Sequence, residues 1–122
     1  MDKERRRFTR VPFEARVIIK YQSITIDAKL VDISLNGALA KCPHTCMLSI
    51  GDSCEVTIDM GETHTPIQYD AHIVHIQDKI VGLQCQEIPA ESASALKELM
   101  ARYLADDELL HREIDAMVSE MR

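Results

Sequence analysis

The residues best suited to bind an anion lie near the start of the chain, where four arginines occupy a segment of six positions: Arg5, Arg6, Arg7 and Arg10. A guanidinium group is effectively always charged, and its planar N–H donors fit phosphate and carboxylate oxygens. About twenty residues later the chain turns between Asp32 and Gly37. Asp32 offers a carboxylate that accepts from guanidinium or a nucleobase N–H, Ser34 offers a hydroxyl, and Gly37 offers a backbone that bends and can be approached closely. Together these groups predict a site for a small anionic ligand that carries a base.

The arginines and the turn form two short motifs. Residues 6–10 read R-x-x-x-R, and residues 32–37 read D/N-x-S-x-x-G. In this order and at this separation they resemble the PilZ domain, the bacterial receptor module for the second messenger cyclic di-GMP. Residues 71–76 and 81–85 look like the late strand hairpin of that family, so the resemblance covers nearly the whole chain.

The resemblance implies a mainly β fold, namely a six-stranded antiparallel PilZ-type β-barrel with a flexible basic N-terminal arm and C-terminal α-helices. It implies one domain over residues 1–122, with the arm at 1–12, the barrel at 13–88 and the helices at 91–122. Independently, six short segments are predicted to be strands, most of them with the alternation of apolar and polar residues that is typical of a half-buried sheet. Their spacing favours a closed or nearly closed barrel, with strands at 15–21, 24–31, 38–41, 54–59, 67–76 and 80–86.

After Pro89 the apolar period lengthens from two to nearly four, which predicts two helices. Ser92 and Ser94 are candidates for the N-cap of the first helix, and Asp106 and Asp107 favour the start of the second. The first apolar stripe, which includes Leu96, Leu99 and Met100, is expected to pack on the barrel. The second, which includes Leu110, Ile114 and Met117, could pack or present an adaptable surface to a partner.

By resemblance, Arg6 and Arg10 are ligands of phosphate and guanine, and Arg5 and Arg7 are flanking donors. Asp32 and Ser34 would contact the ligand directly, while Gly37 would shape the turn and allow close approach. Alternatively, the segment 32–37 is simply a turn at the end of a strand, since its residue types are common turn formers.

One position departs from the family pattern. His75 stands where many PilZ domains carry a larger residue, often Trp, that packs beside a guanine. Imidazole is a smaller stacking surface whose charge varies near neutral pH, so this contact would be weaker or dependent on pH. The alternative is that His75 only decorates a strand face.

Charge is distributed unevenly along the chain. Residues 1–20 hold seven basic and three acidic side chains, a local charge of +4 within a chain of net charge −6. An acidic body repels a long polyphosphate, whereas a compact dianion can occupy a local basic patch. With three Tyr and two Phe, the chain also lacks the aromatic platforms that stack single-stranded bases. DNA and RNA are therefore not expected partners.

Several other classes are disfavoured by composition. No apolar run approaches the roughly 20 residues of a membrane span, and no signal-peptide stretch is present, so we predict a cytoplasmic protein. Cys42, Cys46, Cys54 and Cys85 are expected to be free thiols. Zinc could be held by Cys42, His44 and Cys46 with Cys54 and Cys85 completing the set, but the spacing does not match that of usual zinc ligands. Neither a metal nor another cofactor is therefore expected. The sequence shows no nucleophile motif and no phosphate loop, so an enzyme is not expected.

These observations predict a non-catalytic cyclic di-GMP receptor that acts as a monomer. The ligand, bound singly or as a stacked pair, would order residues 4–12 across the barrel mouth and alter a surface that a partner protein reads. The alternative is a ligand-independent adaptor of PilZ fold, in which the arm and the C-terminal helices dock a partner.

Overall fold

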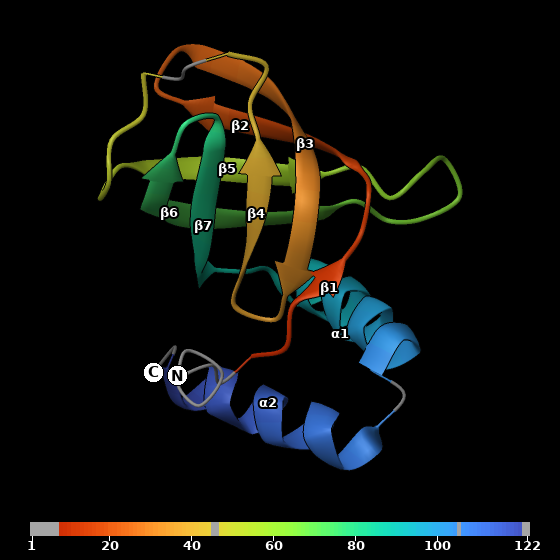
Figure 1. Cartoon of the computed structure of the whole chain (residues 1–122). Helices are drawn as coiled ribbons and strands as arrows, with labels where there is room; N and C mark the ends of the chain where they lie inside the picture. The colour runs from red at the N-terminus through yellow and green to blue at the C-terminus, as the bar shows by residue number, and fades with distance from the viewer. Residues whose placement is uncertain (1–7, 45–46, 105, 121–122) are drawn as a thin grey trace.

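Six strands of the chain close into a barrel (Figure 1). The structure is a computed structural model that describes residues 8–44, 47–104 and 106–120. Each strand pairs antiparallel with its neighbours in the order β3-β2-β5-β6-β7-β4, and the pairing of β4 with β3 completes the ring. The predicted six-stranded antiparallel barrel is confirmed. Its strands are β2 (Arg16–Tyr21), β3 (Ile24–Ser34), β4 (Gly37–Lys41), β5 (Ser53–Ile58), β6 (Ile67–Gln77) and β7 (Ile80–Glu87).

The interior of the barrel is built from alternate residues of these strands, because successive side chains of a strand point to opposite faces. Val17 and Ile19 on β2 and Val56 and Ile58 on β5 are almost completely buried. These aliphatic side chains make the barrel a packed core, so binding chemistry must lie on its surface.

Two thiols and a phenol share this interior. Cys54 and Cys85 both pair with Ala71, from β5 and β7 respectively. Burial raises the pKa of the Cys54 thiol to about 11 and that of Cys85 to about 12, and it also raises the pKa of the Tyr69 hydroxyl. The three groups are therefore held in their neutral forms well above neutral pH.

We expect the protein to lose stability in alkaline solution. The folded state keeps these protons at a pH where the unfolded chain releases them, so the stabilisation is complete below pH 9.0, the ordinary thiol value, and declines towards pH 11 to 12. Each deprotonating group removes up to about 1.4 kcal/mol of unfolding free energy per pH unit. Thermal unfolding in reductant between pH 7 and pH 11 measures the decline. The Cys54→Ala/Cys85→Ala variant is expected to show a shallower decline from a lower starting stability, and equal slopes would contradict this assignment.

A seventh, two-residue strand lies outside the predicted set. β1 (Val11–Pro12) pairs with β3, with Val11 opposite Ile33 and Pro12 opposite Asp32. Phe8 and Val11 are both buried. The expectation of a flexible arm over 1–12 is therefore wrong for residues 8–12, because their apolar side chains pack into the core. Arg5, Arg6 and Arg7 lie outside the described residues.

The two helices lie together beneath one end of the barrel, as Figure 1 shows, and are α1 (Ala90–Leu104) and α2 (Asp107–Glu120). Asp106 caps α2, because its Oδ1 accepts a hydrogen bond from the Leu109 N–H at 3.0 Å. The predicted capping role of Ser92 or Ser94 is wrong, since α1 already begins at Ala90. The Ser92 hydroxyl instead accepts a hydrogen bond from the Gln68 N–H at 2.9 Å and ties α1 to β6.

Two features of the described residues bear on a membrane span and on a metal site. Among the described helices, none is both long enough and apolar enough to cross a membrane. Within the same ranges, no group of three or more His, Cys, Asp or Glu side chains is placed to hold a metal ion. Cys42, Cys54 and Cys85 are buried, whereas Cys46 lies outside the described residues.

Candidate functional site

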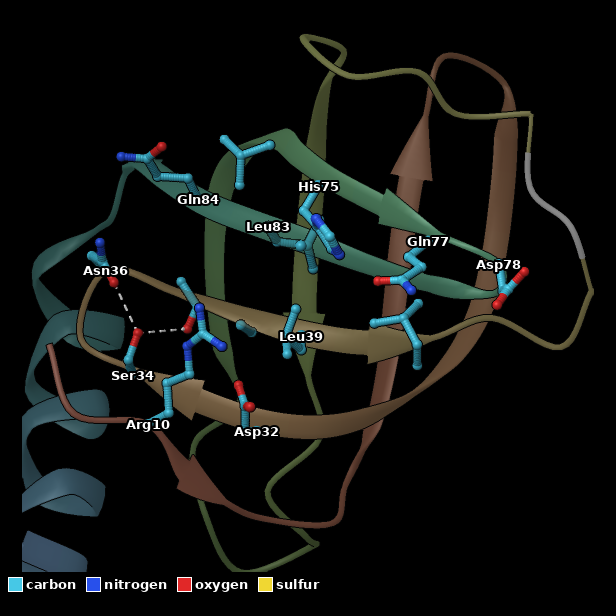
Figure 2. Close-up of a pocket in the computed structure, with 15 residues that line it drawn as sticks. Arg10, Asp32, Ser34, Asn36, Leu39, His75, Gln77, Asp78, Leu83 and Gln84 are labelled. Atoms are coloured by element: carbon cyan, nitrogen blue, oxygen red, sulfur yellow. Dashed lines mark hydrogen bonds between the residues drawn. The ribbon is translucent and has the colours of Figure 1, made fainter. Parts of the chain in front are cut away.

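A cleft of about 650 Å³ opens on the barrel surface between the β3–β4 hairpin and the β6–β7 hairpin (Figure 2). The pairing of β4 with β7 forms its base, with Leu39 opposite Gly82 and Gly37 opposite Gln84. Its lining contains five of the residues predicted from sequence, which are Arg10, Asp32, Ser34, Gly37 and His75. The fold therefore brings together one motif arginine, the turn and the late hairpin.

Among the described residues, Arg10 is the arm arginine, and it lies at this cleft. It comes directly before β1, whose pairing with β3 sets Pro12 opposite Asp32 and so fixes the backbone on which Arg10 stands. Its side chain is exposed and extends into the cleft on the side occupied by Asp32 and Ser34, as Figure 2 shows. A guanidinium in this position can donate to an anion or to the acceptor edge of a base.

The turn is held by its own hydrogen bonds. Ser34 is 5% exposed, and its single O–H hydrogen is shared between two acceptors, Asn36 Oδ1 at 2.9 Å and the Gly37 carbonyl oxygen at 3.3 Å. The backbone carbonyl oxygen of Asn36 accepts a hydrogen bond from the Cys85 N–H at 2.8 Å, which links the turn to β7. Ser34 thus stabilises the turn that lines the cleft, a role the sequence did not distinguish from ligand contact.

At Gly37 the group that approaches closely is the backbone of β7. A Cβ atom at this position would overlap the Leu83 carbonyl oxygen of β7. The glycines with positive φ are Gly51 and Gly61, so a left-handed turn conformation is not what requires glycine at position 37. Gly37 lets the β3–β4 hairpin approach β7 closely and so closes the barrel beneath the cleft.

His75 reaches the cleft because β6 is irregular at this point. The register shifts between Ile73 and His75, which leaves Val74 as an extra residue in β6. Such a bulge re-aims the side chains beside it. His75 is exposed at the cleft and pairs with Gly82, where an added Cβ would lie 2.9 Å from the His75 Cβ. Gly82 therefore makes room for His75. A glycine inside an apolar strand often marks a bulge or a close approach, so Gly82 was the sequence signal for this irregularity.

Besides Asn36 of the turn, three polar residues in the lining were not predicted: Gln77, Asp78 and Gln84. These three residues belong to no sequence motif, and the pairing of β6 with β7 brings them to the same surface as the turn. Amide groups offer both donors and acceptors, and the carboxylates of Asp32 and Asp78 accept hydrogen bonds. This lining combines hydrogen-bonding groups for a base edge with an arginine for an anion, an arrangement that suits binding.

The chain matches a known protein family along most of its length. A family model described as the PilZ domain matches residues 4–102, a range that includes the arm arginines, the turn and the barrel strands and ends before α2. Among solved structures, the Bacillus subtilis inhibitor of motility MotI/DgrA has a TM-score of 0.72 at 22% identity, over 83% of this chain and 51% of its own.

Two structures from Escherichia coli are also similar. The PilZ domain of YcgR with c-di-GMP has a TM-score of 0.67 at 16% identity, over 94% of this chain and 98% of its own. YcgR in complex with c-di-GMP has a TM-score of 0.67 at 19% identity, over 97% of this chain and 51% of its own. The chain thus spans about half the length of MotI/DgrA and of the longer YcgR chain. At these identities the likeness establishes the fold.

Proposed function

This chain belongs to the PilZ domain family, and on that basis we propose that it is a non-catalytic receptor that binds cyclic di-GMP at the cleft. The observation that carries the proposal is the meeting of Arg10 with the Asp32–Gly37 turn in one cleft. These residues come from the two family motifs, which are separated along the chain. The c-di-GMP complexes of the YcgR structures support the same ligand class.

In the proposed complex, the Arg10 fork donates either to a phosphate or to guanine N7 and O6, which accept a bidentate arginine well. The Asp32 carboxylate accepts from guanine N–H groups or orients an arginine. His75 and Gln84 flank the base from the β6–β7 hairpin. Arg5, Arg6 and Arg7 supply further donors, and this number of arginines accommodates either one ligand or a stacked pair.

The proposed output is a change of surface. A dianionic ligand would draw the arm residues before Phe8 across the cleft and neutralise part of the basic charge in residues 1–20. A ligand shifts such an equilibrium only by its greater affinity for the closed arrangement. The altered face would then be read by a partner protein.

Isothermal titration calorimetry with cyclic di-GMP, with GTP as the control nucleotide, tests the proposal. We expect saturable heat with a stoichiometry of one or two, no saturable heat with GTP, and a higher Tm in the presence of ligand. Ligand at 100 times its Kd stabilises the folded state by about 2.7 kcal/mol. Absence of both binding heat and thermal stabilisation would reject the receptor function and favour the ligand-independent adaptor.

A further inference from the structure

Helix α2 contains one buried carboxylate, although other acidic residues on the helix are exposed. Glu113 is 3% exposed, whereas the acidic residues Glu108 and Asp115 on the same helix are exposed. Burying a carboxylate is costly unless hydrogen bonds replace its lost hydration. The groups that donate hydrogen bonds to Glu113 therefore indicate its structural role.

Both of its carboxylate oxygens accept from one residue of the arm. The Thr9 N–H donates to Glu113 Oε1 at 3.0 Å, and the Thr9 hydroxyl donates to Oε2 at 2.6 Å. The two residues are 104 positions apart in the chain. This contact joins α2 to the R-x-x-x-R segment at the residue immediately before Arg10, and residues 8–10 run from β1 down to α2 (Figure 1).

The contact also anchors the backbone next to Arg10. Thr9 is bound to α2 and Val11 is buried in the core, while Arg10 between them lines the cleft. Phe8, on the other side of Thr9, is also buried. The residues on both sides of Arg10 are therefore anchored, and Arg10 stands between them at the cleft.

We propose that Glu113 is a positioning residue for ligand binding, which holds Thr9 so that Arg10 is presented to the cleft before the ligand arrives. The inference rests on the proposed function and adds an element to it, because α2 lies beyond residues 4–102 that match the family model. Preorganisation of this kind raises affinity by reducing the ordering that binding would otherwise require.

Five single variants test the contact by calorimetry with cyclic di-GMP. Glu113→Ala removes both acceptors and is expected to weaken binding about tenfold or more, in keeping with loss of hydrogen bonds to a charged group. Thr9→Val, which removes the hydroxyl at constant shape, and Glu113→Gln are expected to lose affinity several-fold. Thr9→Ser, which keeps the hydroxyl, is expected to bind within about twofold of the wild type. Asp115→Asn removes the same charge as Glu113→Gln from an exposed site on α2 and is expected to bind normally.

Amide hydrogen exchange provides a readout that does not depend on the ligand. In the wild type the Thr9 amide is expected to exchange slowly, and Glu113→Ala is expected to accelerate it, because its acceptor is removed. Circular dichroism verifies that α2 stays helical. If Glu113→Ala unfolds α2, then Thr9→Val, which changes one hydroxyl, and its control Thr9→Ser decide the question.

Three results would overturn the inference. Faster Thr9 exchange with unchanged affinity would reduce Glu113 to a structural role. Unchanged exchange would show that the contact does not hold the arm. Equal losses in Asp115→Asn and Glu113→Gln would assign the effect to net charge on α2. If the wild type itself binds no cyclic di-GMP, the proposed function fails, and the exchange data alone decide whether Glu113 holds the arm.

Discussion

Replacement of Arg10 with alanine is expected to weaken cyclic di-GMP binding by at least about 30-fold, since truncating one partner of a hydrogen-bonded charge pair costs 2 kcal/mol or more. Arg10 stands directly before β1, and its side chain lines the cleft beside Asp32. Alanine removes the planar fork that phosphate or guanine would engage. Calorimetry on the folded variant measures the loss.

Two further arginine variants separate geometry from charge. Arg10→Lys keeps the positive charge but not the fork, so we expect an intermediate loss. Arg16→Ala removes the same side chain from β2, where Arg16 forms an exposed ion pair with Asp27 at 2.9 Å outside the cleft lining, and is expected to bind within about twofold of the wild type. Equal losses in Arg10→Ala and Arg16→Ala would assign the effect to net charge. Normal binding by Arg10→Ala would contradict the site.

Replacement of Gly37 with alanine is expected to lower the free energy of unfolding by about 2–4 kcal/mol. The added Cβ would meet the Leu83 carbonyl group and approach the Gln84 Cα at 3.3 Å. These are backbone atoms of β7, which cannot move aside without disturbing its pairing with β4. Urea unfolding measures the loss, and weaker ligand binding is expected to accompany it because Gly37 also lines the cleft.

The matched control is Gly61→Ala. Gly61 has a φ of 97° and no heavy atom within 4 Å of an added Cβ, so alanine there meets backbone strain without a steric overlap. We expect a cost of roughly 1 kcal/mol. A Gly37→Ala variant no less stable than Gly61→Ala would show that β7 does not constrain position 37.

Much of the fold was predictable because its signals are local. The alternation of apolar residues marked the barrel strands, and the change of period after Pro89 marked the helices. The same locality explains the failures. β1 is too short to show a period, and Phe8 reads as part of a charged arm until the core that buries it is known.

The sequence by itself determined the family and which motif residues to examine, because the arginine segment and the turn are each written within a few neighbouring residues. Only the tertiary structure decided how these residues are used. Three features join segments that are distant along the chain. They are the bulge at Val74 that exposes His75, the approach of Leu83 to Gly37, and the hydrogen bonds from Thr9 to Glu113. Such contacts depend on strand register and helix docking, which the closure of the barrel and the packing of its core fix together, so no local pattern of residues encodes them.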